Sequence, residues 1–355
     1  MRASPYITWA KERAHLRYSL ARSGAPACRP EELEAGPGDL VLHGPDEDGW
    51  MPLREAVGDR YGVRPGQVAL AHGTSLANHL VCSALLEPGD EVLVEHPGYE
   101  PLTLVPELLG ARTRRFDRES EMPGLLDPGR VLEALGPDTR MVVLSHPHNP
   151  TGRLAGREAL KELAGLAESR DFHVLVDEVY LDLAAEAPRT AALLSPRVIA
   201  TGGLTKSFGL GGLRAGWVIA SEETAERVRR LNDLFTVLVA HTTERLALRA
   251  LERAETLLAP RRALLSRNRE RVDTFIRRRG ELEWSPPDTG TVGWVRLEGA
   301  EVDRLCAVLE GEHESAVAPG RFFGVHDHFR IGFGMEGADL EEALRRLGSA
   351  LDSLF

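Results

Sequence analysis

Lysine is scarce in this chain of 355 residues: only Lys11, Lys161 and Lys206 occur among its 43 Lys and Arg residues. Arginine supplies nearly all of the positive charge, so a general need for cations does not explain a lysine at any one position. Lysine can form a Schiff base with a carbonyl compound, whereas arginine cannot. Lys206 is the most informative of the three, because it lies between glycine-rich turns in TGGLTKSFGLGGLRAGW (201–217).

Basic residues as a whole are fewer than acidic residues. The sequence has 54 acidic residues, a net charge of -11 and an isoelectric point near 5.6. Nucleic acids and anionic membranes attract basic proteins and repel acidic ones, so we expect neither as a partner. Any anion that the protein binds must be held by a local arrangement of donors.

Cysteine is rare, and long apolar runs are absent. Cys28, Cys82 and Cys306 are odd in number, far apart, and lack the paired spacing of a metal site, which indicates reduced thiols. The sequence contains no apolar run of about 18 residues and no secretory signal pattern at its start. We therefore expect a soluble, cytoplasmic protein.

The rest of the sequence alternates between short apolar runs and amphipathic segments, a pattern typical of α/β proteins. An amphipathic start around Tyr6–Leu16 is followed by a Pro- and Gly-rich extended segment, 24–49, and by a helix that ends at Gly62. The predicted strands are 68–71, 91–94, 113–116, 141–144, 173–177, 197–201, 216–220 and 293–297. The predicted helices are 74–86, 100–109, 128–135, 157–169, a helical hinge over 223–258, and three more between 261 and the end.

Polar residues follow several of these strands. After 68–71, Thr74 or Ser75 is suited to cap a helix whose N-terminus would bind an anion. Tyr99, Asn149 and Asp177 follow three further strands, and Pro150 holds Asn149 out of helical conformation. An aspartate at a strand end suits either magnesium-phosphate chemistry or a cationic ligand.

Three simpler motifs can be set aside. GGLTKS (202–207) has Thr205 where a nucleotide-binding phosphate loop requires glycine, and GLGGLRAG (209–216) lacks the third glycine of a dinucleotide fingerprint. His146 and His148 form an HxH pair, but no third ligand occurs at suitable spacing. We therefore predict no metal site.

Six short motifs occur in the chain in one order, and together they indicate a protein family far more specifically than any one of them alone. They are GTS at Gly73, PGY at Pro97, HNPTG at His148, DEVY at Asp177, TKSFGLGGLRAGW at Thr205 and FRIGFG at Phe329. In this order the chain resembles the class I/II aminotransferase family of pyridoxal-5'-phosphate enzymes over essentially its full length. The resemblance implies a homodimer that moves an amino group between an amino acid and a 2-oxo acid by a ping-pong cycle.

The resemblance also implies the fold. We expect a mostly parallel, seven-stranded sheet flanked by helices, with a smaller α+β domain made from both chain ends. The implied parts are an N-terminal arm and part of the small domain at 1–45, a large cofactor-binding domain with the interdomain helix at 46–258, and the remaining small domain at 259–355.

The resemblance implies roles for the residues at the reacting centre. Lys206 would hold the cofactor as a Schiff base and later move the proton at the substrate α-carbon. Asp177 would pair with the pyridine nitrogen, and Asn149 and Tyr180 would hydrogen-bond the phenolic oxygen. Tyr99 would stack on the ring.

The resemblance further implies two sets of anion-binding residues. Thr74, Ser75 and Leu76 at a helix N-terminus would bind the cofactor phosphate together with Thr205 and Arg214. Arg330 would bind the substrate carboxylate with its planar guanidinium, and Asn149 would assist it.

Two positions depart from the family pattern. Many members have a phosphate-binding serine three residues before the lysine, where this chain has Gly203, so Thr201 or Thr205 would supply that contact. Many members also use a tyrosine from the neighbouring subunit, whereas LHGPDEDGW (42–50) offers only His43 as a substitute.

Two alternative functions are compatible with parts of this resemblance. A lyase or cyclase of the capreomycidine-synthase type, acting on an arginine-like amino acid, shares the abstraction at the α-carbon, and the residues above do not exclude it. A non-catalytic cofactor-binding module of a transcription regulator would need a basic N-terminal DNA-binding extension. The acidic composition and the early start of the main body speak against that second alternative.

Overall fold

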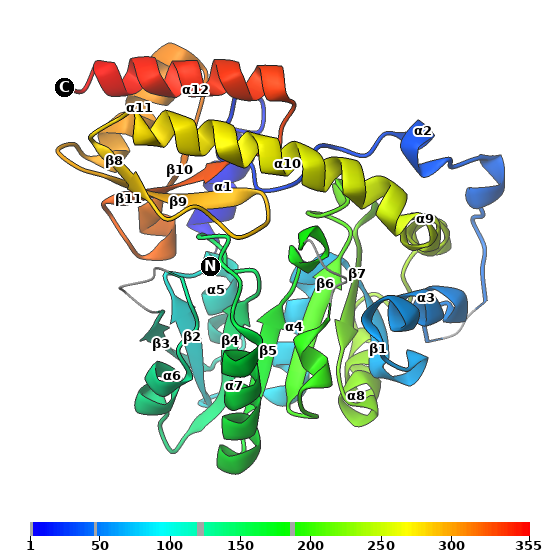
Figure 1. Ribbon diagram of the computed structural model, residues 1–355. Helices are drawn as coiled ribbons and strands as arrows, with labels where there is room; N and C mark the ends of the chain where they lie inside the picture. Colours follow the sequence, from blue (N-terminus) through cyan, green and yellow to red (C-terminus); the bar gives the residue numbers. More distant parts are fainter. Residues whose placement is uncertain (1–2, 46–47, 119–123, 185–188) are drawn as a thin grey trace.

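The protein is described by a computed structural model that covers residues 3–45, 48–118, 124–184 and 189–355. Two sheets organise the chain, a seven-stranded sheet within residues 68–219 and a four-stranded sheet within 282–332 (Figure 1). Among the described residues, no helix is both long and apolar enough to span a lipid bilayer.

The large sheet has the strand order β1-β7-β6-β5-β4-β2-β3. Its strands are β1 (Val68–His72), β2 (Glu91–His96), β3 (Arg112–Asp117), β4 (Thr139–Ser145), β5 (His173–Asp177), β6 (Val198–Gly203) and β7 (Ala215–Ile219). Strands β3, β2, β4, β5 and β6 pair in parallel, whereas β7 runs antiparallel to both β6 and β1. This confirms the predicted mostly parallel sheet of seven strands.

Helices cover both faces of this sheet, because successive strand residues point to opposite sides. Val92 and Val94 of β2 pack in the cluster that α4, α5 and α8 bury, while Leu93 packs in the cluster beneath α6 and α7. The helices of this domain are α3 (Met51–Tyr61), α4 (Gly73–Leu85), α5 (Glu100–Leu108), α6 (Pro128–Ala134), α7 (Arg157–Arg170), α8 (Glu222–Asn232) and α9 (His241–Glu252).

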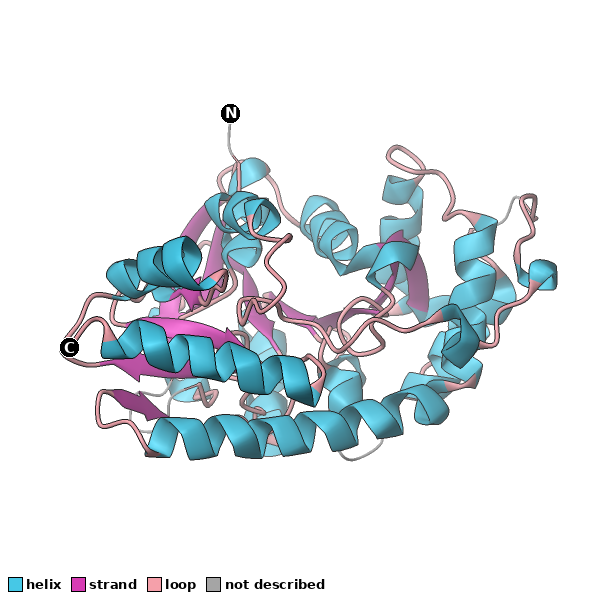
Figure 2. Cartoon of the chain, turned by 90° about the horizontal axis from the view of Figure 1, so that it is seen from above, coloured by secondary structure: helices cyan, strands magenta, loops and turns pink. Residues whose placement is uncertain are grey.

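The smaller domain is an antiparallel sheet with helices against it. Its strands, in the order β10-β11-β9-β8, are β8 (Leu282–Trp284), β9 (Val292–Leu297), β10 (Ala318–Pro319) and β11 (His328–Gly332). Its helices α11 (Val302–His313), α12 (Gly337–Asp352) and the outer part of α10 (Ala254–Arg277) pack together on one face of this sheet, against Val295, Leu297 and Ile331. Figure 2 shows this layer of helices from above. Two N-terminal helices, α1 (Pro5–Glu12) and α2 (Pro30–Leu33), complete the chain.

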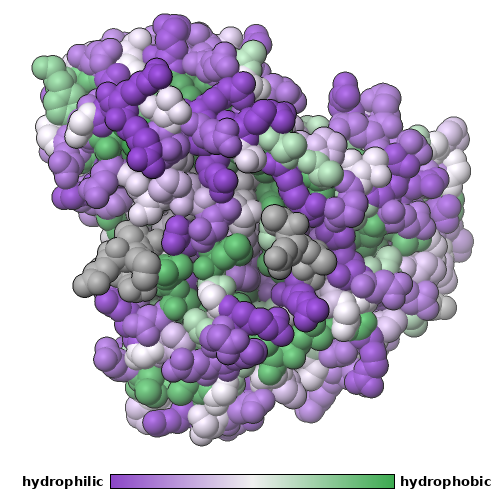
Figure 3. All heavy atoms as spheres, in the orientation of Figure 1, coloured by the Kyte–Doolittle hydropathy of each residue, from purple (hydrophilic) through white to green (hydrophobic). Residues whose placement is uncertain are grey.

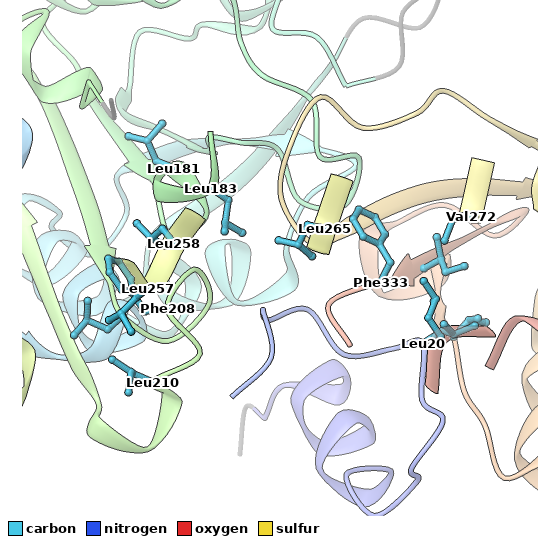
Figure 4. Close-up of a cluster of buried hydrophobic side chains, with 14 of the residues drawn as sticks. Leu20, Leu181, Leu183, Phe208, Leu210, Leu257, Leu258, Leu265, Val272 and Phe333 are labelled. Carbon is cyan, nitrogen blue, oxygen red and sulfur yellow. The ribbon is translucent and has the colours of Figure 1, made fainter. Parts of the chain in front are cut away.

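Helix α10 links the two domains. Leu257 and Leu258 lie beside Leu181 and Phe208 of the large domain, whereas Leu265 and Val272, further along the helix, lie toward Phe333 and Leu20 (Figure 4). The expected domain boundary between residues 258 and 259 therefore falls inside an unbroken helix. On the outer face that α10 and α12 form, hydrophilic residues predominate (Figure 3).

The N-terminal segment of residues 20–28 passes between the domains. Its backbone accepts a hydrogen bond from Gly332 N at Leu20 O (2.6 Å) and donates one from Ala25 N to Lys206 O (2.8 Å). The residues that this segment passes must be glycines. A Cβ at Gly332 would lie 1.8 Å from Arg22 O, and one at Gly209 would lie 2.0 Å from Pro26 O. The glycines of FRIGFG and SFGLGG thus allow this segment to lie directly against the site.

Candidate active site

A cavity of about 430 Å³ lies between the carboxyl edge of the large sheet, the N-terminus of α4, the segment 20–28 and α1. Its volume is within the usual range of small-molecule sites. Nine of the eleven predicted site residues line it: Thr74, Ser75, Tyr99, Asn149, Asp177, Tyr180, Thr205, Lys206 and Arg214. Parallel strands bring their carboxyl ends to one edge, which is why residues far apart in sequence meet here.

Lys206 follows β6 and points into the cavity. Its Nζ donates a hydrogen bond to Ser23 Oγ at 2.9 Å. Desolvation lowers the pKa of its amine to about 8; Arg330 lowers it too, while Asp177 acts in the opposite direction. Ser23 also hydrogen-bonds Tyr180, whose pKa burial raises to about 12. The amine is therefore far easier to deprotonate than that of an exposed lysine.

Asp177 ends β5 and is 5% exposed. Its Oδ2 accepts a hydrogen bond from Asn78 Nδ2 at 2.9 Å, and its Oδ1 accepts one from Val179 N at 3.1 Å. Burial raises the pKa of the Asp177 carboxyl, and these two hydrogen bonds oppose that rise. Both oxygens are thus held in place by the protein.

Arg330 comes from β11 of the small domain and is fully buried. Its Nη1 donates to Asn149 Oδ1 at 3.0 Å, and its Nη2 donates to Tyr6 Oη at 2.7 Å and to Ala21 O at 2.9 Å. Its buried Nε has no hydrogen-bond partner within the described part of the chain. With Oδ1 occupied, Asn149 has its Nδ2 amide as the donor to offer to a ligand.

A second part of the cavity, which we call the α4 end, comprises Thr74, Ser75, Thr205 and Arg214. Thr74 Oγ1 is buried without a hydrogen-bond partner among the described residues. A Cβ at Gly73 would lie 2.4 Å from Arg214 Nη2, so glycine leaves room for the guanidinium above the helix. A helix N-terminus with an adjacent arginine and an unpaired hydroxyl is suited to an anion.

The capping prediction for this helix was wrong. Either Thr74 or Ser75 was expected as the N-cap residue, but α4 begins at Gly73 and its N-cap is His72. The two hydroxyl residues therefore lie in the first turn. Since they do not close the helix, their side chains are free to line the cavity.

Leu76 does not line the cavity; its side chain packs against the hydrophobic cluster beneath α4. Its predicted contact stays a prediction. Arg330 is also outside the lining residues, although its partner Asn149 is among them. The ring of Tyr99 lines the cavity and meets Tyr6 edge-on, with ring centroids 5.8 Å apart.

One of the two departures from the family pattern, at Gly203, has a visible cause. A Cβ at Gly203 would lie 2.7 Å from Ala215 O and 3.0 Å from Thr74 Oγ1, so a serine there would collide with the neighbouring strand. The Thr201 hydroxyl donates to Asn78 Oδ1 at 2.6 Å, whereas Thr205 lines the cavity. His43 is exposed, and since its expected contact is with another subunit, its role stays a prediction.

The two histidines of the HxH pair are buried inside the protein. His148 Nδ1 hydrogen-bonds Thr151 Oγ1 at 2.7 Å and its Nε2 hydrogen-bonds Pro97 O at 2.8 Å. Burial lowers the pKa of the His146 ring to about 4 and that of the His148 ring well below its usual value. Burial thus favours the neutral form of both rings, and His148 connects the turns that carry Tyr99 and Asn149.

Among the lining residues that were not predicted are Tyr6, Ser23 and Asn78. Asn78 follows Ser75 by three residues and so lies on the same face of α4, a spacing that could have indicated it. Tyr6 and Ser23 carry no local signal, because only the packing of the N-terminal segment brings them to the cavity.

The family model for aminotransferases of class I and II matches residues 21–347. The chain belongs to this family. It is 33% identical to capreomycidine synthase of Streptomyces vinaceus, covering 84% of this chain and 78% of that protein. It is 28% identical to arginine–pyruvate transaminase of Pseudomonas aeruginosa, covering 86% and 81%. It also superimposes on a crystal structure of a PLP-dependent aminotransferase from Streptococcus suis with a TM-score of 0.92 and 26% identity, covering 100% and 99%.

Family membership makes the protein a pyridoxal-phosphate-dependent transferase, and the cavity fits that cofactor. The α4 end offers an anion site with an unpaired buried hydroxyl, and Asp177 offers a carboxylate deep in the cavity. Lys206, with its easily deprotonated amine, lines the same cavity. These three features match a phosphate, a protonated ring nitrogen and an aldehyde.

Proposed function

We propose that the protein is an aminotransferase that moves an amino group from an L-amino acid to a 2-oxo acid by ping-pong chemistry. The observation that carries this proposal is the placement of Lys206 in one cavity with Asp177, and of Arg330 hydrogen-bonded to the lining residue Asn149. An amine, a carboxylate and a guanidinium are the groups needed to move a proton, to pair with a cationic ring and to bind a carboxylate.

Pyridoxal phosphate, when bound, supplies an electron sink for the carbanion formed at the substrate α-carbon. Lys206 would hold the cofactor, and its amine, once free, would accept the α-proton and return it. A pKa near 8 leaves an appreciable fraction of free amine unprotonated close to neutral pH. Asp177, fixed by Asn78 and Val179, would keep the ring nitrogen protonated.

Arg330 and Asn149 would orient the substrate through its carboxylate. The Nε of Arg330 is a buried N–H donor without a partner among the described residues, and it lies on a guanidinium that Tyr6 and Ala21 already hold. Amino acids and 2-oxo acids both carry this carboxylate. One cavity would therefore accept the donor and the acceptor in turn, which is the basis of the ping-pong proposal.

A second candidate function is a lyase or cyclase acting on an arginine-like amino acid. The observation that favours it is the 33% identity with capreomycidine synthase. Proton abstraction by Lys206 would be common to both reactions, so the residues that touch the α-carbon do not separate them.

The two candidates differ in their products. The purified protein, loaded with cofactor, is mixed with single L-amino acids, and both the cofactor spectrum and the products are followed. Transamination predicts conversion to the pyridoxamine form, release of the matching 2-oxo acid, and restoration of the spectrum by a second 2-oxo acid. A cyclic product or ammonia, formed with no acceptor present and with the starting spectrum restored, would contradict transamination and support the second candidate.

We also infer a homodimer. Several apolar side chains are well exposed: Leu40 (59%), Leu42 (91%), Leu234 (81%), Phe235 (51%) and Val237 (62%). The two stretches of chain that carry them lie on neighbouring elements, since Thr242 Oγ1 donates to Val41 O at 2.8 Å and Arg230 pairs with Asp48. Monomers rarely expose such groups together, so a second copy would cover them.

Light scattering tests this inference. A dimer is expected for the wild type, and Leu42→Arg with Phe235→Arg should shift it toward the monomer; a monomeric wild type would contradict the inference.

The three cysteines form no disulfide, with Cys82 and Cys306 buried and Cys28 half-buried. The cytoplasmic location that they suggest stays a prediction.

A further inference from the structure

A chain of hydrogen bonds lies behind Asp177 and connects three elements of the large domain. Thr201 Oγ1 on β6 donates to Asn78 Oδ1 at 2.6 Å, and Asn78 Nδ2 on α4 donates to Asp177 Oδ2 at 2.9 Å. Asn78 and Asp177 are each 5% exposed and Thr201 is 1% exposed. Polar groups buried to this degree depend mainly on protein partners, because little of their surface is open to water.

Thr201 fixes which end of the Asn78 amide faces the carboxylate. A side-chain amide has an acceptor at Oδ1 and donors at Nδ2. If the amide were reversed, Oδ1 would face the Asp177 carboxylate and two acceptors would oppose each other. The hydroxyl of Thr201 donates to Oδ1 and so stabilises the orientation in which Nδ2 points at Asp177.

The ionised form of Asp177 needs this support. Burial favours a protonated carboxyl, and the hydrogen bond from Asn78 is the largest of the effects that favour the carboxylate. A neutral carboxyl could not keep a pyridine nitrogen protonated, and the cofactor would then be a weaker electron sink.

We propose that Asn78 is a positioning residue that, with its amide held by Thr201, keeps the Asp177 carboxylate ionised and directed at the ring nitrogen of the cofactor. The role rests on the cofactor of the family and on the proposed pairing of Asp177 with that nitrogen. It does not depend on which substrates are used.

Asn78→Leu tests the proposal, since leucine has the same branched arrangement of heavy atoms and no hydrogen-bond donor. With pyridoxal phosphate labelled at the ring nitrogen, the ¹⁵N chemical shift of the bound cofactor should move from the protonated toward the unprotonated value. Loss of a hydrogen bond to a charged group should also weaken cofactor binding roughly 10- to 100-fold. A wild-type ¹⁵N shift together with wild-type affinity in Asn78→Leu would overturn the proposal.

Asn268→Leu is the matched control. Asn268 is another fully buried asparagine, whose Nδ2 donates to Phe333 O at 2.9 Å and to Met335 O at 2.7 Å, and it does not line the cavity. Its replacement should lower the unfolding temperature and leave the ¹⁵N shift unchanged. A change of the ¹⁵N shift as large as that in Asn78→Leu would show a general effect of destabilisation and would overturn the proposal.

Thr201→Val tests the second link. It should move the ¹⁵N shift in the same direction but less far, since the Asn78 amide remains present and loses only its fixed orientation. The double variant Asn78→Leu/Thr201→Val should lose no more cofactor affinity than Asn78→Leu alone, because Thr201 acts through Asn78. Additive losses would contradict this link. If these effects appear but no 2-oxo acid is released, the role of Asn78 stands and the proposed transamination fails.

Discussion

The two ends of the cavity are prepared for a ligand in different ways. At the α4 end, Thr74 Oγ1 is buried without a partner in the described part of the chain, and Gly73 leaves space below Arg214. At the other end, which we call the Asp177 end, Asp177 is bonded to Asn78, and Arg330 is bonded to Asn149 and Tyr6. At the α4 end a buried hydroxyl has no partner, whereas at the Asp177 end the side chains already hydrogen-bond one another and Arg330 Nε remains without a partner among the described residues.

This difference corresponds to what each end would do. A phosphate brings its own acceptor oxygens, so unpaired donors at the α4 end are satisfied only when the ligand binds. The Asp177 end would act on reacting atoms, where side chains must be in place before the substrate arrives. We therefore expect substitutions at the α4 end to affect cofactor affinity, and substitutions at the Asp177 end to affect turnover or substrate binding.

The largest effect is expected for Lys206→Ala, which removes the amine that serves both ends. Loss of a group that transfers the α-proton should lower kcat by about 10²- to 10⁴-fold. Lys161→Ala is the matched control, because Lys161 is an exposed surface lysine paired with Glu158. Steady-state kinetics on both variants measure this. Normal turnover in Lys206→Ala would refute the proposed chemistry.

The next effect separates the two ends. Arg330→Lys keeps the charge but loses the planar fork, so KM for amino acid and 2-oxo acid should rise roughly 10- to 100-fold. Arg214→Lys should instead weaken cofactor binding and leave these KM values little changed. Kinetics at saturating cofactor and a cofactor titration, run on both variants, measure the two effects. If both variants change the same parameter, the distinction between the ends is wrong.

A smaller effect compares two buried threonines. Thr74→Val removes a hydroxyl that has no partner, so the unfolding temperature of the apoprotein should stay the same or rise, while cofactor binding weakens roughly tenfold. Thr201→Val removes a donor that Asn78 uses, so its apoprotein should be less stable. Thermal unfolding of both apoproteins is the measurement. Equal destabilisation by the two substitutions would contradict the comparison.

The smallest effect concerns pH. Desolvation lowers the pKa of the Lys206 amine from 10.5 to about 8, so between these values the unfolded chain holds a proton that the folded apoprotein does not. The stability of the apoprotein, relative to Lys206→Met, should therefore rise with pH across this window. Denaturant unfolding of both proteins at pH 8 and pH 10 measures it. A constant or falling difference would show that the amine is not desolvated.

Much of this arrangement could be predicted from the sequence. Short apolar runs that end at Asn149 and Asp177 indicate strands, and parallel strands bring such ends together. The direction of 215–219 was not predictable, because an apolar run reads the same either way. It runs antiparallel because the connection from Gly203 to Ala215 is too short for a helical crossover.

Other features depend on tertiary structure alone. Ser23 reaches Lys206 only because the segment 20–28 returns between the domains, and the approach of Gly332 to Arg22 O shows how closely it packs. The local sequence of a strand and the helix that follows it cannot indicate a contact with a segment so far away in the chain. Asn78 lies on the same face of α4 as Ser75, but its bond to Asp177 was missed because that partner is also distant, 99 positions away on another element.

The most direct test of the account uses the scarcity of lysine. Borohydride reduction fixes the cofactor to the lysine that holds it, and peptide mass mapping then has only Lys11, Lys161 and Lys206 to distinguish. The account predicts a phosphopyridoxyl group on the peptide that contains Lys206 and on neither of the others. A label on Lys11 or Lys161, or an unlabelled protein after reduction of the cofactor-loaded form, would contradict it.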